Sequence, residues 1–205
     1  MPLTPPKLVI FDMDDVLLRY DPDARRAAMG EMAGMTAAEV RRLIWTSGIE
    51  SASDAGKLSI DAYLDAISTA LGIPFGRADW ARTRALSMHL NPDVVRLAAA
   101  IRPRTRLALL TNNGHIMKEH FDVLVPSLRE IFGARMHVAA EFRTKKPDPA
   151  IYTRLLAIYG VSPHDGVMID DRRSNVDGAL AAGLRAHRFH DAAALEAYLA
   201  DLSLI

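Results

Sequence analysis

The stretch LVIFDMDDVLLRY, residues 8–20, sets an apolar run directly before three carboxylates. The run from Lys7 to Phe11 predicts a strand that is buried on both faces, which is typical of a parallel sheet covered by helices. Asp12 and Asp14 follow it two positions apart, and residues at that spacing share one face of an extended chain. Because ligands of open α/β sheets bind beyond the carboxyl ends of the strands, we expect both acids to face a crevice there.

Two further apolar runs predict strands that lie parallel to the first. They extend from Arg106 to Leu110 and from Gly166 to Ile169, and each is followed by polar residues. Helical patterns alternate with the strands, which indicates an α/β fold with a doubly wound parallel sheet. Weaker strand patterns cover Met136 to Ala139 and Leu184 to Arg188, and the expected helices are Asp93 to Ile101, Pro149 to Tyr159, Asn175 to Ala182 and Ala192 to Leu202.

The chain from Leu18 to Asn91 breaks this alternation, because it contains helical patterns and no convincing strand. Glycine-containing joints separate the patterns, which predicts an all-helical subdomain inserted after the first strand. We therefore expect a core formed by residues 1–17 and 92–205 and a helical cap formed by residues 18–91. The helices expected in the cap are Asp23 to Met32, Thr36 to Trp45, Ser59 to Leu71 with Ser59 as its N-cap, and Arg77 to His89.

The composition excludes several kinds of protein. The 205 residues carry 25 Lys and Arg against 25 Asp and Glu, so no basic excess supports a nucleic-acid or membrane partner. The chain has no cysteine, which excludes disulfides and thiolate chemistry. No apolar run approaches the ~18 residues of a membrane helix, and the first residues lack a secretion signal. We expect a cytoplasmic protein, and the sequence leaves its oligomeric state open.

The second strand ends in LALLTNNG, residues 107–114, which offers groups that bind anions. Thr111 supplies a hydroxyl and Asn112 an amide, and Gly114 is expected to let the chain turn tightly into the next helix. Phosphate oxygens bind well at such a helix N-terminus. A simple capping turn would use the same residues, and this motif alone does not separate the two interpretations.

Another candidate group lies in TKKPDPAIY, residues 144–152. Lys146 precedes a proline, which holds it in an extended conformation outside the following helix. Asp148 is expected to cap that helix and Pro149 to be its first residue. The sequence thus fixes a lysine just ahead of a helix, although Lys145 competes for the same role.

The third strand leads into a pair of acids, Asp170 and Asp171, in GVMIDDRRSNVDGALAAG, residues 166–183. Oxygen ligands of this kind suit Mg²⁺, so the sheet edge is a candidate metal site. Capping of the next helix is the alternative interpretation of the two acids. Asn175 is expected to be structural, hydrogen-bonded into the loop.

The four motifs together, in the order DxDx[VT], [ST]N, KPDP and DD, resemble those of the haloacid dehalogenase superfamily. The resemblance covers nearly the whole chain and includes a helical cap inserted after the first motif. Within the superfamily, GKLSIDAYLDAI (56–67) and TNNGH (111–115) make the chain most similar to small-molecule phosphatases of the glucose-1-phosphate phosphatase type. The resemblance implies a Rossmann-like core and phosphate chemistry.

Matching the motifs position by position implies roles for five residues. Asp12 corresponds to the nucleophile, which would form an aspartyl-phosphate. Asp14 corresponds to the general acid and base. Thr111 and Asn112 correspond to the phosphate-binding pair. Lys146 corresponds to the lysine that neutralises the nucleophile and the transferring phosphoryl group.

The resemblance also implies a bound Mg²⁺. Its expected ligands are the Asp12 carboxylate, the Asp14 backbone carbonyl and Asp171, with Asp170 as a further ligand or as a support for one. Asp15 departs from the family, which often has glycine there. We expect Asp15 to point away from the site and to accept hydrogen bonds from backbone groups where the chain turns toward the cap.

The resulting hypothesis is a Mg²⁺-dependent phosphatase that hydrolyses a small phosphate monoester, with sugar phosphates favoured. A hydrolytic 2-haloacid dehalogenase is one alternative, but Asp14 and the pair Asp170 and Asp171 argue against it, because dehalogenases of this family work without metal and lack the second acid of DxD. A non-catalytic phosphate-binding or signalling module is a second alternative. Receiver domains of that kind are shorter, lack a cap and carry their phosphate-accepting Asp after a later strand.

Overall fold

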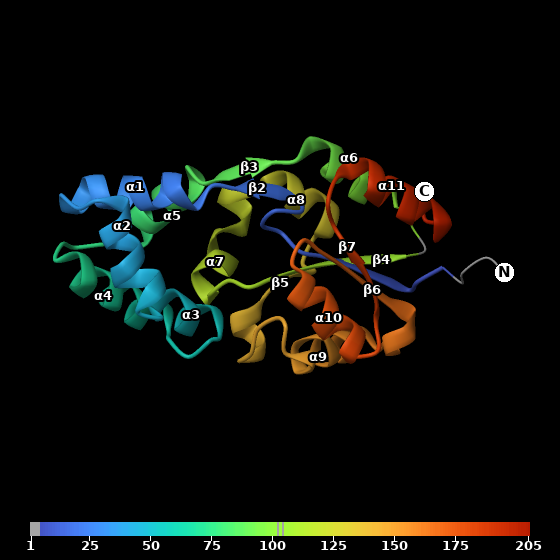
Figure 1. Ribbon diagram of the computed structural model, residues 1–205. Helices are drawn as coiled ribbons and strands as arrows, with labels where there is room; N and C mark the ends of the chain where they lie inside the picture. Colours follow the sequence, from blue (N-terminus) through green and yellow to red (C-terminus); the bar gives the residue numbers. More distant parts are fainter. Residues whose placement is uncertain (1–4, 102, 104) are drawn as a thin grey trace.

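The computed structural model describes residues 5–101, 103 and 105–205, and its centre is a five-stranded parallel sheet (Figure 1). The central strand pairs with its two neighbours in matching register, so that Leu8 lies beside both Arg106 and Gly166. The expected doubly wound α/β fold is confirmed. The strands, in spatial order, are β5 (Met136–Val138), β4 (Arg106–Thr111), β1 (Leu8–Phe11), β6 (Gly166–Asp170) and β7 (Arg185–Arg188).

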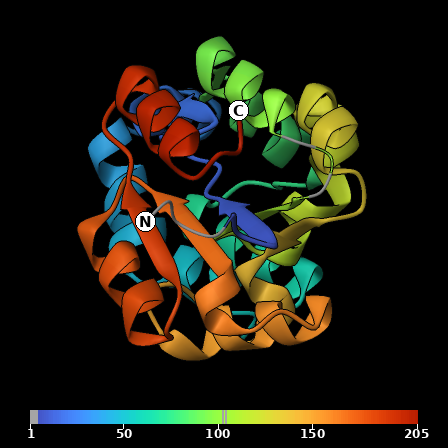
Figure 2. The same cartoon turned by 90° about the vertical axis from the view of Figure 1, so that its right-hand side faces the viewer.

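Helices cover both faces of this sheet (Figure 2). Val9 and Phe11 of β1 pack into one layer and Leu8 and Ile10 into the other, which is why the strand is apolar throughout. Removing each large side chain from water stabilises the fold by about 1.5–3 kcal/mol. The first layer contains α6 (Pro92–Ala100), α7 (His115–Leu124), α8 (Pro126–Phe132) and α11 (Ala192–Asp201), and the second contains α9 (Pro149–Tyr159) and α10 (Arg173–Ala181).

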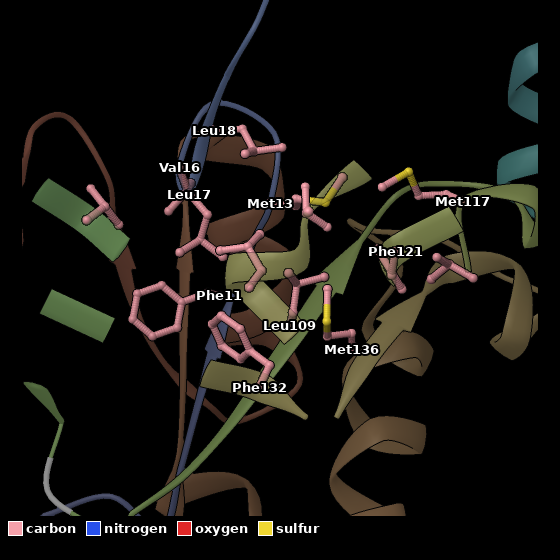
Figure 3. Close-up of a cluster of buried hydrophobic side chains, with 14 of the residues drawn as sticks. Phe11, Met13, Val16, Leu17, Leu18, Leu109, Met117, Phe121, Phe132 and Met136 are labelled. Atoms are coloured by element: carbon pink, nitrogen blue, oxygen red, sulfur yellow. The ribbon is translucent and has the colours of Figure 1, made fainter. Parts of the chain in front are cut away.

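The apolar residues around the acids of the first motif anchor that segment in the core (Figure 3). Met13, Val16 and Leu17 are fully buried in the same cluster as Phe11. The ring of Phe11 meets that of Phe132 edge to face, with the centroids 5.9 Å apart. Because these side chains point into the core, the acids between them are turned toward the end of the sheet.

The inserted subdomain lies on the side of the molecule away from the C-terminus (Figure 1). Ser59 caps one of its helices by accepting from the backbone N–H of Ala62, as expected, and Thr36 forms a capping box with Glu39. These helices agree with the expected inserted cap, and its bounds at residues 18 and 91 stay a prediction. Its helices are α1 (Pro22–Ala33), α2 (Ala37–Val40) continued by a π-helical turn, η1 (Arg41–Thr46), then α3 (Ile49–Asp54), α4 (Ile60–Leu71) and α5 (Arg77–Ala85).

The expectation that residues 18–91 contain no strand is wrong. An antiparallel ribbon of β2 (Leu18–Tyr20) and β3 (Met88–Leu90) joins the cap to the core. The pairing of Leu18 with Leu90 joins residues far apart in the chain, so no local pattern reveals it. The helix expected to reach His89 ends at Ala85, because Met88–Leu90 form the strand β3.

Several short helices were not predicted at all. The joint between the second and third expected cap helices contains α3, and α7 and α8 follow the second core strand. Short 3₁₀ turns, η2 (Ala139–Phe142) and η3 (Pro163–Asp165), complete the core. Within the part of the chain that the structure describes, no helix has the length and apolar character needed to span a membrane.

Three glycines allow parts of the chain to approach one another at the site end of the sheet. A Cβ on Gly56 would lie 2.4 Å from the carbonyl oxygen of Ala140, and one on Gly114 would lie 2.2 Å from Ser53 Oγ. The expectation that Gly114 allows a tight turn is wrong, because its backbone has φ −75°, which any residue adopts. The missing side chain of Gly114 instead gives room to the cap helix α3. On α10, a Cβ on Gly178 would lie 2.1 Å from the carbonyl oxygen of Pro147.

We expect Gly178→Ala to destabilise the protein by about 1–3 kcal/mol, because the new methyl group meets backbone that has no space to move. Helix propensity alone would predict the opposite sign, a gain of about 1 kcal/mol. Urea unfolding measures the free-energy difference. Gly76→Ala, with no atom within 4 Å of the new Cβ, is the control for an added methyl group and should cost no more than about 1 kcal/mol, because Ala is a poorer N-cap than Gly. A Gly178→Ala protein as stable as the parent would contradict this packing.

Candidate active site

Asp12 lies at the end of β1 and is almost completely buried, with 6% of its surface exposed. Its Oδ1 accepts hydrogen bonds from the backbone N–H of Met13 at 2.7 Å and from Lys146 Nζ at 2.8 Å. Burial raises the pKa of the Asp12 carboxyl well above its usual range, and the negative charges of Asp170 and Asp14 add to this, whereas Lys146 opposes it. The positive charge of Lys146 therefore does not fully compensate for the burial of the Asp12 carboxylate.

Lys146 is buried between two carboxylates. Its Nζ lies 2.8 Å from Asp12 Oδ1 and 2.6 Å from Asp170 Oδ2. Burial alone would lower the pKa of Lys146, but the two carboxylates outweigh it and the pKa is raised, so the ammonium stays charged. Lys145, the competing candidate, points elsewhere and donates to Ser51 Oγ of the cap at 2.7 Å.

The Asn112 side chain holds the backbone of Lys146 in place. Its Oδ1 accepts from the Lys146 N–H and its Nδ2 donates to the Lys146 carbonyl, both at 2.9 Å. Thr111, at the end of β4, is buried, and its Oγ1 accepts a hydrogen bond from Asn113 Nδ2 at 2.7 Å. The amide of Asn112 is thus engaged with the lysine loop, and it orients the group that lies against Asp12.

Asp170 is the last residue of β6 and Asp171 follows it, and the two acids differ in their surroundings. Asp170 is fully buried and accepts hydrogen bonds from Lys146, from Asn175 Nδ2 at 2.9 and 3.1 Å, and from the Arg172 N–H at 2.9 Å. The structural role expected for Asn175 is confirmed by these bonds. Asp171 is half-buried, and Arg188 Nε donates to its backbone carbonyl at 3.3 Å, whereas no side chain of a described residue donates to its carboxylate. Burial with the charge of Asp170 raises the pKa of Asp171.

The carboxylates of Asp12, Asp170 and Asp171 form a group that fits a small divalent cation. Each contributes an oxygen, and these oxygens lie within 4.8 Å of one another. Hard oxygen ligands of this type suit Mg²⁺, and the pKa values of Asp12 and Asp171 are raised first by burial and then by the neighbouring acids, both of which a bound cation would offset. Asp14 is outside this carboxylate group, and the expected contribution of its backbone carbonyl stays a prediction.

Asp14 is held by an arginine of the cap, which the sequence did not predict. Arg84 Nη2, at the C-terminal end of α5, lies 2.8 and 2.7 Å from the two carboxylate oxygens of Asp14. Asn113 Nδ2 is 3.3 Å from one of them. The Arg84 guanidinium also lies 4.3 Å from the ring centroid of Tyr20 and is 2% exposed. A single arginine on a polar helix gives no local signal that separates it from a solvated one.

Asp15 caps the chain at the entrance to β2, as expected. Its Oδ1 accepts from the Tyr20 backbone N–H at 3.0 Å. The residue has φ 61°, a left-handed conformation that glycine adopts without strain and that Asp and Asn tolerate better than most residues. Asp15 also lines the cavity described next, so the expectation that it points away from the site is wrong.

A cavity of about 270 Å³ lies where the sheet edge meets the cap. Its core side includes Asp12, Asp14, Thr111 and Asn112, four of the residues that the sequence assigned to one sheet edge. Lys146, Asp170 and Asp171 are not among the lining residues and lie behind Asp12. Helices of the cap supply the opposite wall. The remaining lining residues are Asp15, Tyr20, Trp45, Glu50, Ser51, Asp54, Arg84, Asn113, Lys145, Arg172 and Asn175.

Comparison with protein families gives one match that spans most of the chain. The family described as haloacid dehalogenase-like hydrolase matches residues 6–183. A phosphoserine phosphatase from Thermus thermophilus is 25% identical and aligns with 88% of this chain and 87% of its own. A flavin mononucleotide hydrolase from Arabidopsis thaliana is 38% identical, but that match covers only 29% of this chain and 24% of the plant protein.

Solved structures show the same fold. A HAD family enzyme from Bacteroides thetaiotaomicron, solved in complex with magnesium and inorganic phosphate, superposes with a TM-score of 0.77 at 17% identity, covering 90% of this chain and 94% of its own. An L-2-haloacid dehalogenase from Xanthobacter autotrophicus has a TM-score of 0.62 at 19% identity, covering 89% and 76%. At these sequence identities, both similarities show a shared fold.

We expect Asp171→Asn to weaken Mg²⁺ binding by at least about tenfold, since it removes the charge of the carboxylate with the fewest partners in the group. Isothermal titration calorimetry of the purified protein measures the affinity. Asp15→Asn is the control, because it removes an acid beside the group and keeps a side chain that tolerates the left-handed backbone. Equal affinities for parent and Asp171→Asn would show that the cation binds elsewhere.

Proposed function

Because the chain belongs to the haloacid dehalogenase-like hydrolases, we propose that it is a phosphatase that hydrolyses a small phosphate monoester through an aspartyl-phosphate. The observation that carries the proposal is the position of Asp12, whose carboxylate lies between the Lys146 ammonium and a group of oxygens that fits a divalent cation. The phosphoserine phosphatase relative and the neighbouring fold solved with magnesium and inorganic phosphate support the same chemistry.

In the proposed reaction Asp12 is the nucleophile. One of its oxygens attacks phosphorus, a new bond forms between that oxygen and phosphorus, and the bond between phosphorus and the ester oxygen breaks. Asp14, in protonated form, donates its proton to the departing alkoxide, which leaves as the alcohol. A water then attacks the phosphorus of the aspartyl-phosphate and gives its proton to Asp14, which releases inorganic phosphate and restores Asp12.

The positive charge around Asp12 makes this attack feasible, because a carboxylate and a phosphate dianion repel each other. Lys146 holds Asp12 in place and offsets part of that repulsion. A Mg²⁺ ion held by Asp12, Asp171 and the Asp14 carbonyl, with Asp170 in support, would neutralise further charge on the phosphate oxygens. Thr111 and the Asn112 backbone, in our proposal, bind those oxygens from the end of β4.

The cap is proposed to select the alcohol part of the substrate, because its helices form the outer wall of the cavity. Closure of such a wall excludes water from the reacting groups. A sugar phosphate is the substrate that the sequence resemblance favours.

The 2-haloacid dehalogenase remains the nearest rival reaction, because a solved enzyme of that kind shares the fold. Asp14 and Asp171 favour the phosphatase. A dehalogenase would use Asp12 against carbon, with no phosphate to neutralise and no need for a group of acids that holds a cation. A phosphate-binding module without catalysis would not need Asp14 at a position where it can pass a proton to a leaving group.

We expect Asp12→Asn to reduce phosphate release by several orders of magnitude, because an amide is a poor nucleophile toward phosphorus. Release of inorganic phosphate from p-nitrophenyl phosphate with Mg²⁺ measures it. Asp93→Asn, the same change at an exposed helix start, is the matched control and should keep parental activity. Near-parental turnover by Asp12→Asn would refute the mechanism, and halide release from 2-chloropropionate that EDTA does not affect would favour the dehalogenase.

A further inference from the structure

Asp54 is an acid of the cap that the proposed phosphate chemistry does not use. It ends α3 and lines the cavity, and no described residue forms a hydrogen bond or ion pair with its carboxylate. Glu50, one turn earlier on α3, is by contrast bound by Arg25 Nη1 at 2.8 Å and by the Tyr63 hydroxyl at 2.5 Å. Asp54 is therefore an acid without a partner in the wall opposite Asp12.

The surroundings of Asp54 do not supply the missing partner. Burial and the negative charge of Glu50 raise the pKa of Asp54 well above its usual range, although Lys145 and Arg84 act in the opposite direction. The Lys145 Nζ is directed to Ser51 Oγ. A cationic group brought by a ligand would stabilise the charged form of Asp54, which burial and Glu50 disfavour.

Arg84 offers the opposite charge in the same cavity. Its Nη2 holds Asp14, whereas its Nη1 has no hydrogen-bond partner in the described parts of the chain, and the residue is 2% exposed. A guanidinium has donors to spare in this arrangement and binds a carboxylate with matching geometry. Because Asp14 is proposed to protonate the leaving oxygen, Arg84 lies close to the carbons next to that oxygen.

We propose that the cap recognises a zwitterionic alcohol, with an ammonium paired to Asp54 and a carboxylate paired to Arg84, so that the substrate class is the phosphate esters of hydroxy amino acids. The inference rests on the proposed phosphatase function. A neutral sugar would donate hydroxyl hydrogen bonds to Asp54 but would leave its charge without a counter-charge, and it would leave the Arg84 donors that do not bind Asp14 without a charged acceptor, which is unfavourable. A zwitterion compensates both and adds no net charge to the cavity.

Four phosphate esters that differ only in these two groups test the proposal. O-phosphoserine carries both groups, serinol phosphate only the ammonium, 3-phosphoglycerate only the carboxylate, and glycerol 3-phosphate neither. We expect kcat/KM with Mg²⁺ to be highest for O-phosphoserine and to fall by at least about tenfold for each charged group removed. Glucose 6-phosphate, the representative sugar ester, should rank with glycerol 3-phosphate.

Two variants assign each preference to its residue. Asp54→Asn should abolish the preference for the ammonium and keep that for the carboxylate. Arg84→Gln should do the reverse, whatever its effect on the overall rate through Asp14, because the readout is a ratio between substrates. Arg84→Lys keeps the charge and should retain part of the carboxylate preference. Asp61→Asn, at an exposed site on α4, is the matched control and should keep both preferences.

The proposal is overturned if glycerol 3-phosphate or glucose 6-phosphate is hydrolysed as well as O-phosphoserine. It is also overturned if Asp54→Asn, with its fold verified by circular dichroism, lowers turnover of all four esters equally. Hydrolysis of p-nitrophenyl phosphate with none of the four esters refutes the inference and leaves the phosphatase standing. Absence of turnover with every phosphate ester refutes both.

Discussion

The ammonium of Lys146 lies between two buried carboxylates, and the site end of the sheet is arranged around it. Asp12 follows β1 and Asp170 ends the adjacent parallel strand β6, so that without a cation between them two like charges would face each other inside the protein. The lysine is fixed from two sides. Asn112 binds its backbone, and Gly178 on α10 leaves space for the next residue of the loop. Loss of this ammonium would leave buried charge unpaired, which costs several kcal/mol.

The cap completes the site through a few contacts that cross from one subdomain to the other. Arg84 reaches Asp14 from α5, and Lys145 reaches Ser51 on α3. Glycines at 56 and 114 let α3 lie directly against the loops after β4 and β5. The cavity therefore has a wall of core residues suited to phosphate and a wall of cap residues, Asp54 among them, suited to the rest of a small molecule. In the proposed function, the core carries out the chemistry and the cap selects the substrate.

The sequence predicts the core of this arrangement because its signals are local. Apolar runs mark the strands, prolines and glycines mark where they end, and acids placed directly after β1 and β6 must lie at the same edge of the sheet. Contacts across the chain have no such signal. The pairing of Leu18 with Leu90 and the reach of Arg84 to Asp14 depend on how the cap folds back, and in sequence both look like ordinary surface segments. The role of Asp54 is equally invisible in the sequence, because only the folded cavity shows that its carboxylate lacks a partner.

The central claim is that Asp12 becomes phosphorylated during turnover, and trapping the enzyme in the act tests it most directly. The protein is mixed with p-nitrophenyl phosphate and Mg²⁺, quenched in acid and treated with borohydride, which reduces an acyl phosphate to an alcohol. Peptide mass spectrometry then locates the change. We predict conversion of Asp12 to homoserine, dependent on substrate and absent in Asp12→Asn. Steady release of phosphate with Asp12 unmodified, or modification of another residue in its place, would contradict the account.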